Sequence, residues 1–227
     1  MALALARDGV RVAVLSRGHD AEAAQTVLDL RACGVDALHL AADVTDPAQV
    51  QAAFGAAASR FGALDILVHC ASLRSHTALA DMDLSHWRAV LATNLDAAFL
   101  CSQAALAHFP AVGGRIVFFS GAAAAIGVPM RAHVSAAKAG VEGLTRALAA
   151  ELAARQITVN CVSPGIIDTS GAPGGLQLTP AMRQFPIPAG RQGRPEEVAA
   201  VVRLLVSEEG AYTTGQVVRV NGGMVYG

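Results

Sequence analysis

Residues 135–149 read Ser135-Ala-Ala-Lys-Ala-Gly-Val-Glu-Gly-Leu-Thr-Arg-Ala-Leu-Ala149, and residues 157–169 read Ile157-Thr-Val-Asn-Cys-Val-Ser-Pro-Gly-Ile-Ile-Asp-Thr169. The first stretch places apolar residues at helical spacing, which predicts a helix over 135–154. The second stretch opens with an apolar run over 157–162 and then reaches Pro164-Gly165, which is typical of a buried strand that ends in a turn. A helix followed by a buried strand is one unit of a layered α/β domain.

The same alternation extends in both directions from this unit. Short apolar runs predict five further strands, at Val12–Leu15, Ala37–Ala41, Asp65–Val68, Ile116–Phe119 and Gln216–Val220. The intervening stretches predict helices, at Ala21–Cys33, Asp46–Phe61, Leu84–Phe109 with an interruption around 92–94, and from Pro195 onward. Strands that are apolar throughout and alternate with helices predict a doubly wound, Rossmann-like parallel sheet with helices on both faces.

Composition narrows the class of protein. The chain has 227 residues, 53% of them hydrophobic and 15% charged, which predicts a single folded domain over 1–227. A net charge of −1 and an aromatic content of 4% argue against nucleic-acid partners. No apolar run approaches the ~18 residues of a membrane span, so we expect a soluble, cytoplasmic protein without a membrane partner. The Gly- and Pro-rich stretch 169–193 follows a strand end and predicts a lid.

The four cysteines form no C-x-x-C pair and lie in apolar stretches, which favours small buried side chains over metal or disulfide roles. No metal site is predicted.

Several motifs together resemble the short-chain dehydrogenase/reductase family from one end of the chain to the other. They are residues 135–149 and 157–169, quoted above, with Thr93-Asn-Leu95, Gly193-Arg-Pro-Glu-Glu-Val198 and Val220-Asn-Gly-Gly223. The resemblance implies an NAD(P)-dependent oxidoreductase whose cofactor lies across the carboxyl ends of the strands.

The resemblance assigns roles to individual positions. Lys138 stands where the family keeps its catalytic lysine, and it is the only lysine in the chain beside sixteen arginines. Asn94 matches the asparagine that holds a water in the proton relay. The implied cofactor-binding positions are Ser16, Arg17, Asp43, Val44, Ala71, Lys138, Pro164, Gly165, Ile167 and Thr169. An arginine at position 17 suits a 2′-phosphate and so favours NADP.

Two catalytic positions depart from the family pattern. The family's acid/base tyrosine falls at Val134, which has no proton to give, and its carbonyl-binding serine falls at Gly121. His133, next to Val134, is a candidate substitute donor because imidazole titrates near neutral pH. His69, which follows a strand, is a second candidate.

The largest departure concerns the start of the fold. The family's glycine-rich phosphate turn and first, central strand have no counterpart, so the resemblance implies an N-terminally truncated and catalytically degenerate member. Strands lie ~4.8 Å apart, so the absent strand predicts a gap of nearly ~10 Å between its two neighbours. Either these neighbours close up, or another segment fills the slot, or the natural protein is longer.

These losses favour a non-catalytic pseudoenzyme subunit whose cofactor binding is weak or lost. Such a subunit is expected to form a homo- or hetero-oligomer, the latter with a full-length relative, through helices 96–109 and 135–154 and the C-terminal strand. The alternative is an NAD(P)H-dependent carbonyl or enoyl oxidoreductase with a non-standard proton donor. The sequence does not identify a substrate.

Overall fold

The computed structural model describes residues 1–18, 20–170 and 184–226. Its strands run parallel and form two separate groups. The first group pairs β1 (Val12–Ser16) with β2 (Ala37–Ala41). The second has the order β3-β4-β5-β6 and contains β3 (Ile66–His69), β4 (Gly114–Phe119), β5 (Ile157–Pro164) and β6 (Val217–Val220).

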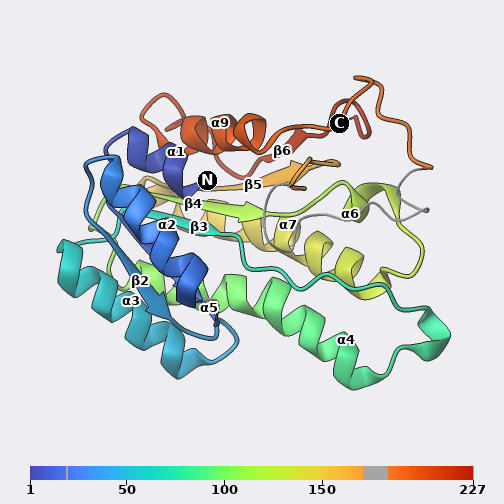
Figure 1. Ribbon diagram of the computed structural model, residues 1–227, viewed down its shortest axis with the longest axis horizontal. Helices are drawn as coiled ribbons and strands as arrows, with labels where there is room; N and C mark the ends of the chain where they lie inside the picture. Colours follow the sequence, from blue (N-terminus) through green and yellow to red (C-terminus); the bar gives the residue numbers. More distant parts are fainter. Residues whose placement is uncertain (19, 171–183, 227) are drawn as a thin grey trace.

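Helices cover both faces of the strands (Figure 1). One face carries α1 (Ala2–Arg7), α2 (Asp20–Ala32) and α9 (Pro195–Val206). The other carries α3 (Pro47–Phe61), α5 (Ala97–Leu106) and α7 (Ala132–Leu152). The shorter elements are α4 (Leu84–Leu91), α6 (Ala123–Ile126), the 3₁₀ turns Leu79–Asp81 and Ala153–Arg155, and the π-helical η2 (Ala92–Asp96). The predicted parallel, doubly covered α/β architecture is confirmed.

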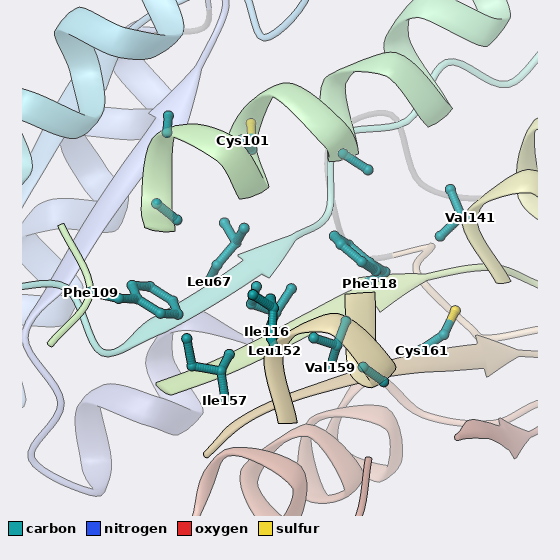
Figure 2. Packing of buried hydrophobic residues seen from close by; sticks show 14 of the residues in the cluster. Leu67, Cys101, Phe109, Ile116, Phe118, Val141, Leu152, Ile157, Val159 and Cys161 are labelled. Atoms are coloured by element: carbon teal, nitrogen blue, oxygen red, sulfur yellow. The ribbon is translucent and has the colours of Figure 1, made fainter. Parts of the chain in front are cut away.

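The core explains why the central strands are apolar throughout. Ile116 and Phe118 of β4 pack toward α5 and α7, as Figure 2 shows, whereas Val117 between them packs toward α9. A strand that is buried on both faces has apolar residues at successive positions and does not alternate between apolar and polar residues. These layers fix the positions of the strand ends, where the loops of the candidate site begin.

The helix starts and breaks agree with the sequence in part. Asp46 caps α3 as expected, with its side chain accepting from the backbone N–H groups of Ala48 and Gln49. The interruption predicted around 92–94 is a π-helical turn inside one continuous helical segment. Residues 171–183 of the predicted lid lie outside the described part of the chain.

The continuous segment Leu84–Leu106 is long and apolar enough to cross a membrane by those criteria alone. Here Val90, Ala98 and Cys101 on this segment are buried, the latter two in the main core. The segment is therefore a core helix of this fold.

The predicted gap between the strand groups is present. A cavity of about 750 Å³ separates β1 from β3 and is lined by both strands and by Leu5, Phe54 and Phe61. The two strands have not closed up, and no segment of the described residues fills the slot.

Candidate functional site

A cavity of about 470 Å³ lies at the carboxyl ends of β4 and β5. Parallel strands end at the same edge of a sheet, so the loops that follow them converge there. The cavity brings together these sequence-predicted positions: Gly121, Val134, Lys138, Pro164, Gly165, Ile167 and Thr169. The remaining predicted positions lie outside its lining.

Lys138 is a buried amine that lines this cavity. It projects from α7, is only 8% exposed, and its Nζ donates to the carbonyl oxygen of Phe119 at 2.8 Å. The pKa of the amine is lowered to about 8, mainly because the charged form loses hydration on burial, with smaller contributions from the nearby Arg74 and Arg131. Lys138 forms no ion pair with any described residue. Because an ammonium has three N–H groups, two remain for a bound molecule.

The wall around Lys138 is apolar where the family places its phenol. Val134, one helical turn before Lys138, is 3% exposed and lines the cavity. A Cβ added to Gly121 would meet nothing closer than the Pro164 carbonyl oxygen at 3.8 Å, so the cavity has room for a larger residue there. The neighbouring Ser120 also lines the cavity, but its hydroxyl donates to Glu142 at 2.6 Å.

Neither candidate histidine lines this cavity. His133 is fully buried, and its Nε2 lies 2.7 Å from the Ser75 hydroxyl. His69 lines the gap between β1 and β3 instead, with its ring edge-on to Phe118. Burial and, secondly, Lys138 lower the pKa of His69 to about 4, so its ring is neutral at pH 7.

Asn94 has a positioning role. It is buried in η2, and its amide nitrogen donates to the carbonyl oxygens of Leu73 at 2.9 Å and Val90 at 2.8 Å. Its amide oxygen accepts from the Ser72 hydroxyl at 2.7 Å. Ser72 lines the cavity, so Asn94 fixes the loop after β3 that forms one wall.

Arg17 and Asp43 lie at the ends of β1 and β2 and form an ion pair. Nη1 of Arg17 is 2.8 Å from the Asp43 carboxylate, and the arginine side chain is 74% exposed. This contact, with the hydroxyl and amide of Thr45, lowers the pKa of Asp43 to about 2. Ser16, also at the end of β1, is hydrogen-bonded to His39, whereas Val44 and Ala71 line the gap between β1 and β3.

Sequence reasoning missed two cationic residues of the cavity, Arg74 and Arg131. Arg131 precedes Val134 by three positions, and residues three apart lie on the same face of a helix. This spacing could have predicted that Arg131 lies on the same side of the helix as Val134. Arg74 follows β3 in an irregular loop, where no periodic pattern indicates its direction.

Comparisons with known proteins place this geometry in a family. Residues 1–225 match the family model described as enoyl-(acyl carrier protein) reductase. The solved structure of a short-chain dehydrogenase/reductase mutant from Serratia marcescens superposes with a TM-score of 0.90 at 32% identity, covering 98% of this chain and 91% of that chain. The chain belongs to the short-chain dehydrogenase/reductase family. A blue fluorescent protein from a metagenomic library, solved with NADPH, superposes equally well (TM-score 0.90, 32% identity, 98% and 91% covered).

Curated relatives of this short-chain dehydrogenase/reductase are named as enzymes. A 3-oxoacyl-[acyl-carrier-protein] reductase of Synechocystis is 39% identical over 99% of this chain and 90% of its own length. A cis-4-hydroxycyclohexanecarboxylate dehydrogenase of Sinomonas cyclohexanicum is 40% identical over 96% of this chain and 88% of its own length. Neither the predicted non-catalytic role nor the predicted weakening of cofactor binding finds support in these relatives. They do not show the predicted truncation either.

The described residues fit a nicotinamide dinucleotide at its two ends. At one end the Lys138 ammonium, with two free N–H groups, stands beside the strand-end segment Pro164–Ile167. At the other end the exposed Arg17 can reach a phosphate. No glycine-rich turn for the pyrophosphate occurs within the described ranges.

Proposed function

We propose that this protein is an NADP(H)-dependent oxidoreductase of carbonyl compounds in which the Lys138 ammonium replaces the family's phenol as proton donor. The observation that carries the proposal is the position of Lys138. Its amine lines the cavity beside Val134 and has a pKa of about 8, and among the described residues it is hydrogen-bonded to the Phe119 carbonyl oxygen only. General acids work best when their pKa lies near the operating pH, and this amine meets that condition.

The residues of this chain have distinct tasks in the reaction. A reduced nicotinamide, when bound, supplies the hydride that the carbonyl carbon takes up. Lys138 Nζ donates a hydrogen bond to the carbonyl oxygen and passes its proton to that oxygen as negative charge develops there. The neutral amine keeps its contact with the Phe119 carbonyl oxygen and regains a proton from water. The apolar wall at Val134 excludes water from the reacting oxygen.

Cofactor choice rests on Arg17. Its guanidinium is exposed and forms the pair with Asp43, so rotation of the side chain brings it to a 2′-phosphate without loss of a buried contact. NADPH is therefore expected to bind better than NADH.

Titration of the purified chain with NADPH tests this function, followed by turnover with a 3-oxoacyl thioester and with simple ketones. The expected results are a saturable change in nicotinamide fluorescence and slow, substrate-dependent oxidation of NADPH. A chain that binds no NADPH at any accessible concentration contradicts the proposal.

A non-catalytic subunit is the second candidate, favoured by the valine at the phenol position and by an exposed aromatic side chain. Phe99 on α5, one of the helices expected to mediate assembly, is 49% exposed. This function predicts a stable complex with an active relative in native extracts and no turnover by the isolated chain. Turnover by the isolated chain excludes it.

A further inference from the structure

The cavity beside Lys138 contains a second buried cation that the mechanism does not use. Arg131, at the N-cap of α7, lines the cavity and is only 6% exposed. Its Nε is buried without a hydrogen-bond partner, and the guanidinium forms no ion pair with any described residue. A buried charge without a partner is strongly unfavourable, so such a residue points to a ligand that completes it.

A second arginine faces the same space. Arg74, from the loop after β3, lines the cavity and has no hydrogen-bond or ion-pair partner within the described ranges. Burial lowers the pKa of Arg131, and the charge of the neighbouring Arg74 lowers it further. Among the side chains of the described lining residues three are cationic, Arg74, Arg131 and Lys138, and none is acidic.

We infer that Arg131 and Arg74 bind a carboxylate of the substrate, so that the enzyme acts on oxo or hydroxy carboxylates rather than on neutral ketones or alcohols. This inference rests on the proposed function and names its substrate class. A guanidinium recognises a carboxylate through paired N–H groups, which gives both affinity and orientation.

Helix geometry sets the size of the substrate. Arg131, at the N-cap, and Val134 and Lys138 follow helical spacing along α7, so ~10 Å of axial rise separates the backbone positions of Arg131 and Lys138. Both cationic side chains are long and line the same cavity, so one compact molecule can contact both. The remaining lining includes Ile126, Val128 and Ile166, which suits an apolar skeleton between the two polar ends.

One relative supports this chemistry. The dehydrogenase from Sinomonas cyclohexanicum is named for a substrate with a hydroxyl and a carboxylate at opposite positions of a six-membered ring. Oxidation of that alcohol yields 4-oxocyclohexanecarboxylate, which we choose as the reactive probe.

The test separates binding from turnover. Cyclohexanecarboxylate and cyclohexanecarboxamide, which have no group to reduce, are titrated calorimetrically into the protein and into Arg131→Gln, Arg131→Lys and Arg74→Gln variants. Arg146→Gln is the matched control, because Arg146 lies exposed on the same helix and its loss changes net charge equally. Thermal unfolding of each variant verifies that it is folded.

We expect the carboxylate to bind at least 10-fold more tightly than the amide. Arg131→Gln should weaken carboxylate binding by about 10- to 100-fold, the range for a lost charge-assisted pair, and should leave amide binding unchanged. Arg131→Lys should recover part of the loss, and Arg146→Gln should have no effect. Equal binding of acid and amide overturns the inference. The inference is also overturned if Arg131→Gln weakens the binding of NADPH but leaves the affinity for the carboxylate unchanged, since the arginines would then bind a phosphate of the cofactor.

Reduction of 4-oxocyclohexanecarboxylate by NADPH distinguishes the two proposals. If the carboxylate binds through Arg131 but NADPH is not oxidised, the anion site stands and the proposed function fails. If 4-oxocyclohexanecarboxylate and its methyl ester are reduced with equal kcat/KM, the proposed function stands and the inferred substrate class fails.

Discussion

At the scale of single residues, Lys138 decides whether this chain performs catalysis. Its amine is protonated below a pKa of about 8 and neutral above it. If the ammonium donates the proton, kcat/KM for reduction should fall about tenfold per pH unit above pH ~8, and the rate of the reverse oxidation should rise over the same range. Initial rates measured from pH 6 to pH 10 test this.

Substitution of Lys138 separates its charge from its proton. A guanidinium at this position keeps the positive charge but does not give up its proton anywhere in this pH range. Lys138→Arg and Lys138→Met should therefore both reduce kcat by about 10²–10⁴, whereas only Lys138→Met should weaken NADPH binding. Steady-state rates and fluorescence titration measure the two effects. An unchanged pH profile in Lys138→Arg contradicts a donor role for this amine.

Restoring the family's residues at positions 121 and 134 should increase the activity of this chain. Gly121 has room for a side chain, and Val134 already lines the cavity one turn from Lys138. The double variant Gly121→Ser, Val134→Tyr should raise kcat by about 10²–10⁴, since it supplies a phenol beside the ammonium and a hydroxyl for the carbonyl oxygen. Gly121→Ser alone is the control and should change kcat much less. A double variant no faster than the parent chain shows that the proton donor does not limit the rate.

At the scale of elements, the π-helical η2 holds one wall of the cavity. Asn94→Ala removes three hydrogen bonds and leaves the Leu73 carbonyl oxygen and the Ser72 hydroxyl without this partner. The free energy of unfolding should fall by about 1–3 kcal/mol, since each lost hydrogen bond contributes about 0.5–1.5 kcal/mol. Ser72→Ala removes one of these bonds and should reduce the free energy of unfolding less. Urea unfolding followed by circular dichroism measures both, and an unchanged midpoint in Asn94→Ala contradicts the role given to Asn94.

The elements also show how far sequence reasoning extends. Apolar runs locate each strand because both faces of the sheet are covered, and the cap at Asp46 locates the start of α3. Polarity at Asn94 predicts a helix break, yet its amide nitrogen donates to the Val90 carbonyl oxygen inside the helical segment. The proximity of Arg74 and Arg131 could not be predicted from the sequence. Arg74 lies in an irregular loop, and only tertiary contacts determine the path of that loop.

At the scale of the whole molecule, the described strands form two groups held together without backbone pairing. Parallel pairing joins β1 to β2 and β3 through β6, but no ladder crosses the 750 Å³ cavity between β1 and β3. Contacts of α3 with α5 and of α1 with α9 connect the groups instead. Side-chain contacts between these helices, including the ion pair of Asp8 with Arg203, therefore resist their separation.

This arrangement predicts that the β1–β2 group opens before the larger sheet. Each cross-strand hydrogen bond that is absent between β1 and β3 removes about 1 kcal/mol of stabilisation. The free energy of opening for the amides of Val12–Ser16 should therefore be at least ~2 kcal/mol lower than for the amides of Ile157–Pro164. Denaturant-dependent hydrogen exchange read by mass spectrometry measures both regions in one sample, and β4, paired on both sides, is the internal control. Equal opening free energies in the two groups would show that the packing of α3 and α1 couples them as tightly as a continuous ladder. In that case the cavity between β1 and β3 would not divide the molecule into separate cooperative units.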